Sequence, residues 1–322
     1  MNNPLRTELH PDFTEVFEKR AELGIPTSSQ VAPEGGRRLL DEAWEDAGVM
    51  DDPPAVGNVR EYPIPGPDGS IPVRIYTPEG SGPFPVVMWM HGGGWIRGDL
   101  GTPDTTCRMI ARQAECTVVS VDYRLAPEHP FPAGLRDCYA TLEWIDENPD
   151  VVLGDEDNLV VGGTSAGGNF AAALSLMTRD FEGPEITFQV LDHPVTDYLF
   201  DRRSYRENAE GFGLDAADMR NYWSHYLDDE IQGYHPYASP LRARDLSGLP
   251  PALVTTAGFD VLRDEGIAYA ERLESAGVRV VHEHYPDIPH ATIASSRLTQ
   301  GFERAHDALE DITAQLRDEF VK

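Results

Sequence analysis

Short, continuous apolar runs alternate with helix-like stretches over most of this 322-residue chain, and this alternation limits its fold more than any other feature. Examples are VVMWM at 86–90, TVVSV at 117–121 and ALVTT at 252–256. Each run is too short for an independent helix, and too uniformly apolar for a strand with one face in water. Strands of this kind are buried on both faces of a parallel sheet, with the intervening helices covering those faces. The pattern therefore predicts an α/β fold with a mostly parallel, doubly wound sheet.

The expected elements follow from the same pattern. The first two strands flank Gly66-Pro67-Asp68-Gly69, a turn signal, and their apolar residues alternate, so they are expected to pair antiparallel. The expected strands are 56–64, 73–77, 86–90, 117–121, 159–162, 187–191, 252–256 and 279–285. The expected helices of the core are 103–115, 134–148, 166–179, 261–276 and 291–320.

Two segments lack this alternation. The N-terminal segment, residues 1–55, has helix-like spacing at 9–23 and 37–47. The second segment, 195–249, has no buried strand and offers helical pieces at 204–209 and 214–226. Because it lies between two core strands, it is expected to sit over the sheet rather than within it. The predicted domains are an N-terminal cap segment (1–55), an α/β core (56–194 and 250–322) and an inserted cap segment (195–249).

Charge and cysteine content exclude several classes of protein. The chain has 55 acidic and 26 basic residues, a net charge of −29, which repels nucleic acids and anionic membranes. Three cysteines form neither a disulfide framework nor a metal-ligand spacing. No apolar run approaches the ~18 residues of a membrane helix. The N-terminus lacks a basic start followed by an apolar stretch, so no secretory signal is expected. These features predict a cytoplasmic protein without a metal.

Lysine is nearly absent: Lys19 and Lys322 stand against twenty-four arginines. A high carboxylate content is tolerated in concentrated salt, where the Debye length falls to ~3 Å at 1 M and surface carboxylates no longer repel one another strongly. Salt adaptation is one interpretation. The other is a GC-rich genome that favours arginine codons, combined with an ordinary acidic surface.

The sequence Gly163-Thr164-Ser165-Ala166-Gly167 follows an apolar run directly and precedes a stretch of small residues. A nucleophilic serine on a tight strand-to-helix turn needs this context, because flanking side chains would collide with neighbouring backbone. The start of the following helix favours negative charge on the attacked oxygen. We therefore predict Ser165 as a nucleophile.

A second motif, His91-Gly92-Gly93-Gly94-Trp95, ends the predicted strand 86–90. Three consecutive glycines are entropically costly, so a stable fold needs a reason to hold them. The N–H groups of Gly92 and Gly93, with that of Ala166, are predicted to form an oxyanion hole. His91 is expected to hold this loop rather than to react.

With Gly98-Asp99, the stretch YRLAPEHPFPA at 123–133 and GTSAGG at 163–168, these motifs give the chain a family resemblance. It resembles the hormone-sensitive-lipase-like branch of the α/β-hydrolases, which includes many microbial carboxylesterases, in its GTSAG variant. The resemblance covers about residues 56–322. It implies an eight-stranded sheet, a two-part cap, esterase chemistry on a small-molecule ester, and no cofactor. Relatives often dimerise through the last strand, so a homodimer is compatible with it.

The base and the orienting acid should follow in the order Ser, Asp, His. Asp260, just after strand 252–256, is preferred over Asp264, although Val261 stands where the family usually has proline. His290 lies just past the last strand and is the predicted base, followed here by Ala291-Thr292 instead of Gly-Phe. His282 and His284 share one face of that strand but have no obvious third metal ligand. His193 and Asp197 are expected at the hinge of the cap.

The predicted reaction is hydrolysis of short- to medium-chain acyl esters through an acyl-enzyme on Ser165. Two alternatives remain open: a non-catalytic receptor with the same fold, and an amidase or deacetylase using the same site. Aromatic residues are candidates for a substrate pocket, or equally for the cap's own core. They are Trp95, Phe200, Tyr205, Phe212, Tyr222 and Trp223.

Overall fold

The computed structural model describes residues 5–37, 53–292 and 302–322. Its centre is an eight-stranded sheet with the order β1-β2-β4-β3-β5-β6-β7-β8. The pairs β1–β2 and β2–β4 are antiparallel and all other neighbours are parallel. The strands are β1 (Asn58–Gly66), β2 (Gly69–Thr77), β3 (Phe84–Met90), β4 (Thr117–Val121), β5 (Gly154–Thr164), β6 (Phe188–Asp192), β7 (Ala252–Phe259) and β8 (Val280–Pro289). The predicted α/β-hydrolase architecture is confirmed.

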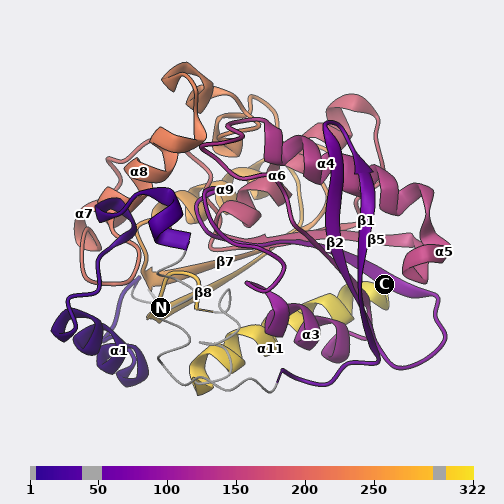
Figure 1. Cartoon of the computed structure of the whole chain (residues 1–322), viewed down its shortest axis with the longest axis horizontal. Coiled ribbons are helices and arrows are strands. Elements are labelled where there is room, and N and C mark those ends of the chain that lie inside the picture. Colours follow the sequence, from indigo (N-terminus) through magenta and orange to yellow (C-terminus); the bar gives the residue numbers. More distant parts are fainter. Residues whose placement is uncertain (1–4, 38–52, 293–301) are drawn as a thin grey trace.

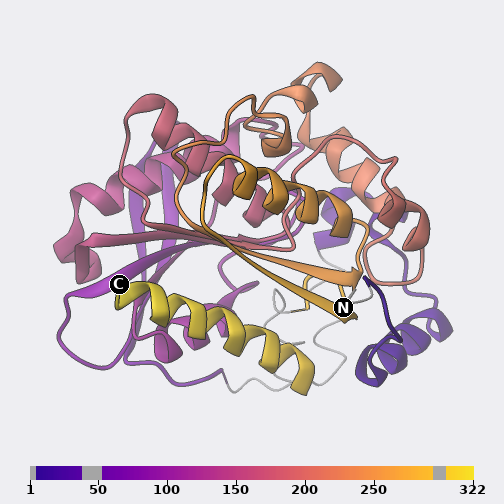
Figure 2. The same cartoon turned by 180° about the vertical axis from the view of Figure 1, so that it is seen from behind.

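Helices cover both faces of the sheet, as Figures 1 and 2 show from opposite sides. On one face lie α3 (Asp104–Gln113) and α11 (Glu303–Phe320). On the other face lie α4 (Ala133–Glu147), α6 (Ala166–Phe181) and α9 (Arg263–Ser275), with the short α5 (Pro149–Val152) beyond α4. The predicted helix at 291–320 is described from Glu303, and residues 293–301 lie outside the described part.

The apolar strand runs divide their side chains between the two faces. In β3, Val86, Met88 and Met90 belong to the core under α4, α6 and α9, while Val87 and Trp89 belong to the core under α3 and α11. All five residues are at most 2% exposed. The sequence interpretation of these runs as strands buried on both faces is thus confirmed.

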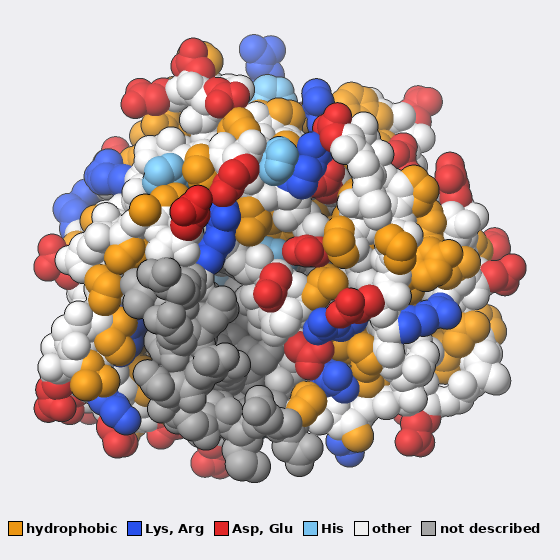
Figure 3. Space-filling model, viewed as in Figure 1, with side chains coloured by type: hydrophobic (Ala, Val, Ile, Leu, Met, Phe, Trp, Pro, Cys, Tyr) orange, Lys and Arg blue, Asp and Glu red, His pale blue; other side chains and the backbone are white. Residues whose placement is uncertain are grey.

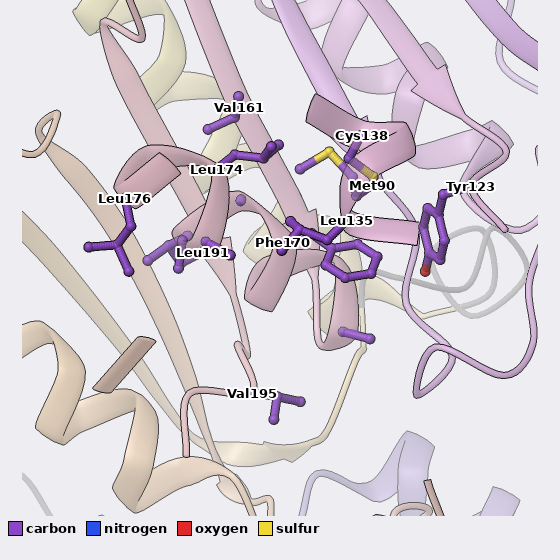
Figure 4. Packing of buried hydrophobic residues seen from close by; sticks show 14 of the residues in the cluster. Met90, Tyr123, Leu135, Cys138, Val161, Phe170, Leu174, Leu176, Leu191 and Val195 are labelled. Carbon is purple, nitrogen blue, oxygen red and sulfur yellow. The ribbon is translucent and has the colours of Figure 1, made fainter. Parts of the chain in front are cut away.

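Helix α6 packs closely on the sheet because its inner positions are small. Ala171, Ala172 and Ala173 are fully buried. Figure 4 shows Phe170 beside Leu135 of α4, between Met90 and Tyr123, and the rings of Phe170 and Tyr123 meet edge to face at 4.9 Å. This packing holds the N-terminal end of α6 against the end of β3.

The remaining helices gather at the carboxyl ends of the strands (Figure 1). They are α1 (Pro11–Glu22), η1 (Ser28–Gln30), α7 (Arg203–Glu207), α8 (Ala216–Tyr226), η2 (Glu230–Tyr234) and η3 (Pro240–Arg242). The N-terminal and inserted segments touch: Ser29 N–H donates to Asp218 Oδ1 at 2.7 Å, and Arg6 donates to the backbone oxygen of Glu207 at 2.9 Å. Most of the predicted helix 37–47 lies outside the described residues.

Strand bounds differ from the sequence expectation by three or more residues in four strands: β2, which begins at Gly69, four residues early, and β5, β7 and β8. β5 begins at Gly154, five residues early, because its first residue pairs with Phe84 across a register shift. β7 and β8 continue to Phe259 and Pro289, since their pairing resumes after a second register shift past Ala257. The longer β7 and β8 end directly before Asp260 and His290. Within the described residues, no helix has the length and apolar character needed to cross a bilayer.

Candidate active site

Ser165 occupies a strained turn between β5 and α6. Its backbone has φ 59° and ψ −113°, a conformation that residues other than glycine seldom adopt. A Cβ on Gly163 would lie 2.5 Å from the backbone oxygen of Met90, and one on Gly167 would lie 2.0 Å from the same atom. Glycine is therefore required on both sides of the serine, because any side chain would force β3 and α6 apart.

The backbone of the strand end next to β5 supports this turn. Ser165 N–H donates to the backbone oxygen of Asp192 at 2.8 Å, and Val195 N–H donates to the backbone oxygen of Ser165 at 3.2 Å. Only 7% of Ser165 is exposed. The strained backbone at Ser165 is thus held in place by the last residue of β6 and the turn that follows it.

The structure brings Ser165, His290 and Asp260 into one chain of hydrogen bonds. Ser165 Oγ lies 2.9 Å from His290 Nε2, and His290 Nδ1 lies 2.7 Å from Asp260 Oδ2. Parallel strands end at one edge of the sheet, so the residues after β5, β7 and β8 meet there. Ser165 and His290 are 125 positions apart in the chain, and Asp260 and His290 are 30 positions apart. The second carboxylate oxygen of Asp260 accepts from Leu262 N–H at 2.8 Å, which fixes the carboxylate plane.

Asp264, the alternative acid, lies elsewhere. Its carboxylate pairs with Arg263 Nε at 2.8 Å and accepts from Ser204 N–H at 2.8 Å. It therefore ties the start of α9 to helix α7 of the inserted segment, and the structure places Asp260, not Asp264, against the imidazole.

The glycine loop lies beside the serine. A Cβ built on Gly92 would be 3.5 Å from Ser165 Cβ, so the loop backbone passes directly over the nucleophile. Within the described chain, no hydrogen bond occupies the amides of Gly92 and Gly93. The amide of Ala166 is at the first turn of α6 and has no partner within that helix. The three predicted donors are thus free for an oxygen at this position.

His91 braces the loop, as expected from the sequence. Its Nδ1–H donates to the backbone oxygen of Gly92 at 2.7 Å, and its ring stacks on Tyr123 at 4.2 Å. Tyr123 Oη donates to the backbone oxygen of His91 at 2.7 Å. Complete burial lowers the pKa of His91 to about 4, so this imidazole stays neutral and serves as a support.

The candidate pocket residues separate into two groups. Trp95 stacks on Tyr226 at 4.1 Å and lies 4.6 Å from Trp223; both tryptophans are 1% exposed, so they form the aromatic core under the cap. Tyr222 covers the glycine loop, since a Cβ on Gly94 would be 2.4 Å from its ring. Phe212 packs on Phe259, directly before Asp260, at 5.0 Å. Of the six aromatic candidates, Tyr222 packs on the glycine loop and Phe212 packs on the residue before Asp260.

Sequence reasoning missed one support of the acid. Asn208, in the inserted segment, donates to the backbone oxygens of Asp260 at 2.8 Å and Gly258 at 3.1 Å. Its own side-chain oxygen accepts from Arg6 at 3.1 Å. The inserted segment therefore holds the loop that carries Asp260, but no motif around Asn208 indicates this contact.

The arrangement places a hydroxyl group, an imidazole in contact with it, a carboxylate in contact with the imidazole, and the backbone amides of the glycine loop at one place. This set suits attack on a carbonyl carbon with transfer of an acyl group to Ser165. Among the described residues, no group of three side chains could hold a metal ion, His282 and His284 included.

Comparison with known proteins points to the same chemistry. Residues 87–294 match a family model described as alpha/beta hydrolase fold. The chain is 42% identical to the carboxylic ester hydrolase LipN of Mycobacterium tuberculosis over 76% of this chain and 66% of LipN. It is 40% identical to an arylesterase of Saccharolobus solfataricus over 76% of this chain and 80% of that one. A thermostable esterase from Pseudomonas putida superposes with a TM-score of 0.92 at 34% identity, over 99% of each chain.

Proposed function

This chain belongs to the hormone-sensitive-lipase-like branch of the α/β-hydrolases and is a serine ester hydrolase, and we propose that it cleaves short- to medium-chain acyl esters with Ser165 as nucleophile, His290 as base and Asp260 as orienting acid. The observation that carries the assignment is the pair of contacts made by His290, 2.9 Å to Ser165 Oγ and 2.7 Å to Asp260 Oδ2.

In the first half of the reaction, Ser165 Oγ attacks the ester carbonyl and His290 Nε2 takes the serine proton. Asp260 keeps the proton of His290 on Nδ1 and stabilises the imidazolium. The tetrahedral oxygen accepts from the amides of Gly92, Gly93 and Ala166. His290 then protonates the leaving alcohol, and the acyl group remains on the serine. In the second half, water repeats the attack and releases the carboxylic acid.

The amides at the glycine loop and at the start of α6 supply much of the rate. Loss of one oxyanion donor typically costs ~10²–10³ in kcat. The N-terminal end of α6 adds its dipole, which favours the negative charge of the tetrahedral oxygen. These groups are in place before the substrate binds, so little reorganisation is needed during the reaction.

The expected substrate size rests on the cap and the surface. Tyr222 and Phe212 place aromatic rings close to the glycine loop and the acid, which suits a compact acyl group. Over the coloured part of the face drawn in Figure 3, acidic and basic side chains are interspersed among the apolar ones, which disfavours binding to a lipid interface. Activity on p-nitrophenyl esters should therefore be highest among the short and medium chains of a series from two to sixteen carbons.

The test is the Ser165→Ala variant with p-nitrophenyl butyrate. We expect kcat to fall by several orders of magnitude and labelling by a fluorophosphonate to disappear. Ser175→Ala is the matched control, because Ser175 lies on the same helix and only donates to the backbone oxygen of Ala171 at 3.0 Å. An unchanged rate in Ser165→Ala would refute the assignment.

The same experiment separates the two alternatives. A wild-type protein that binds a fluorophosphonate at no serine and turns over no ester would be a receptor with this fold. Faster cleavage of p-nitroanilides than of the matching esters would make it an amidase or deacetylase.

We further propose a cytoplasmic, salt-adapted protein. Cys107, Cys116 and Cys138 are buried and unpaired, which is usual where thiols stay reduced. Screening shortens the Debye length from about 10 Å at 0.1 M to about 3 Å at 1 M, so the repulsion within a chain of charge −29 weakens. The melting temperature should then rise between 0.1 and 2 M NaCl. An unchanged melting temperature would favour the codon-usage interpretation.

The family resemblance also leads us to propose a homodimer through β8, which pairs with β7 and with no other strand among the described residues. The N-terminal segment already occupies the end of this edge, where Thr7 N–H donates to Pro286 O at 3.0 Å and His10 N–H donates to Asp287 O at 2.9 Å. The first half of β8 is left for a partner. Light scattering of the purified chain, which should give twice the monomer mass, tests this assembly.

A further inference from the structure

A second histidine–aspartate pair lies beside the one that holds Ser165. His193 follows β6 with φ 45°, a backbone conformation that costs free energy for any residue with a side chain. Its N–H donates to Thr255 Oγ1 at 3.2 Å. The residues around it, Asp192 and Val195, make the two backbone hydrogen bonds that hold Ser165. The turn that fixes the nucleophile therefore also fixes His193.

Asp192 and His193 make a buried contact, which is an ion pair when the imidazole is protonated. His193 Nδ1 lies 2.9 Å from Asp192 Oδ1, and both side chains are 1% exposed. Thr255 Oγ1 donates to the same carboxylate oxygen at 2.6 Å. Burial by itself opposes a charged imidazole, but the Asp192 carboxylate outweighs burial and raises the pKa of His193 above its ordinary value.

The His193 ring packs on the proposed base. Its centroid is 5.8 Å from that of His290, and the planes cross at 68°, an edge-to-face contact. Both nitrogens of His290 are used, one by Ser165 and the other by Asp260, so this contact falls on the rest of its ring.

Other charged or titratable groups surround the two rings within the described residues. Asp260 is shared by both histidines, and His284 of β8 is close enough to interact with His193. Arg263 of α9 lies farther out, and its charge is balanced by Glu207 and Asp264. Among these titratable groups, His193 is the one whose ring packs on the ring of His290.

From this geometry we infer that His193 is a positioning residue for the reaction: its ring holds the His290 imidazole in line with Ser165, and its positive charge opposes protonation of His290, so that the base stays available at lower pH. This inference rests on the ester hydrolysis proposed above. A unit charge 5.8 Å away shifts a titration midpoint by about half a pH unit even when it is screened as in bulk water.

Two variants remove the charge in different ways. His193→Gln keeps an N–H donor for the Asp192 carboxylate, so the buried acid stays paired. His193→Phe keeps an aromatic edge against His290 but provides no donor. The matched control is His129→Gln, which removes an exposed histidine far along the chain from these residues.

The measurement is the pH profile of kcat/KM for p-nitrophenyl butyrate, together with the NMR titration of His290 in selectively labelled protein. We expect both variants to move the midpoint of the acidic limb upward by about half a unit or more, with His129→Gln unchanged. At pH values below the limb this shift is about a threefold loss of kcat/KM, while above the limb the rate stays within a few-fold of wild type.

A purely structural role for His193 would lower kcat or the melting temperature equally at every pH and leave the midpoint in place, and that result would overturn the inference. A downward shift would also overturn it. If the wild-type protein hydrolyses no ester, the proposed function fails, and the NMR midpoint still decides whether His193 acts on His290.

Discussion

Replacing Asp260 by asparagine should disable the base without disturbing the fold. The carboxylate makes two contacts: Oδ1 accepts from Leu262 N–H at 2.8 Å and Oδ2 faces His290 Nδ1 at 2.7 Å. An asparagine has one acceptor and one donor group of the same shape. Because Leu262 offers an N–H, the amide oxygen must turn toward Leu262, and the NH₂ group must turn toward His290.

His290 then has to accept at Nδ1 and carry its proton on Nε2. An imidazole protonated on Nε2 donates to Ser165 Oγ and cannot take the serine proton. Loss of the correct tautomer in a serine–histidine–aspartate site typically lowers kcat by ~10⁴, or about 5 kcal/mol of transition-state stabilisation. We expect a loss of this size for Asp260→Asn.

The assay is steady-state hydrolysis of p-nitrophenyl butyrate at pH 8, with thermal unfolding followed by circular dichroism. Asp264→Asn is the matched control, since that carboxylate contacts Arg263 and Ser204 instead of the imidazole. Its kcat should stay within about tenfold of wild type. Asp260→Asn activity within tenfold of wild type, with a normal melting temperature, would refute the reasoning; an equal loss in Asp264→Asn would do the same.

Two further predictions concern the glycine loop and a buried carboxyl group. Gly93→Ala should lower kcat by ~10²–10³. Its φ is 120°, and a Cβ would lie 2.3 Å from the backbone oxygen of Arg97, so the side chain would displace the oxyanion amides. The control is Gly248→Ala, at φ 71° in open space, which should leave kcat unchanged. Glu265 is fully buried and accepts from the amides of residues 196–197 at 2.7 and 3.2 Å, and burial raises its pKa well above the ordinary value. A raised pKa means that this carboxyl supports folding at low pH and that its contribution is lost as the pH rises through the folded-state pKa. Glu265→Gln keeps the acceptor and cannot ionise, so its melting temperature should increase relative to that of the wild type as the pH rises from 5 to 9. A difference in melting temperature that does not change with pH would contradict this.

Much of the fold could be predicted because its evidence is local. A run such as 86–90 shows by its composition alone that both of its faces are buried, and Gly66–Gly69 shows where the hairpin turns. Strand ends could not be predicted in this way. β7 and β8 continue to Phe259 and Pro289 because each pairs with the other past a register shift, and pairing depends on a distant part of the chain.

The candidate site likewise has features that local sequence indicates and features that it does not. The glycines around Ser165 indicate a tight turn, because only a backbone contact such as that with Met90 O excludes a side chain. The aromatic candidates gave no such indication: Trp95 and Trp223 pack together in the core, while Tyr222 covers the loop. The same aromatic residue can line a pocket or pack in a core, so only its neighbours in the folded chain show which of the two it does.

From its residues alone, then, this chain determines an α/β sheet, a serine on a tight turn and a glycine loop, since each depends on conformations that a few adjacent residues prefer or forbid. Only the tertiary structure decided that Asn208 holds the loop that carries Asp260, and that His193 packs on His290. Those contacts join segments tens of positions apart. They exist because parallel strands bring their carboxyl ends to one edge, and no local pattern records which side chains meet there.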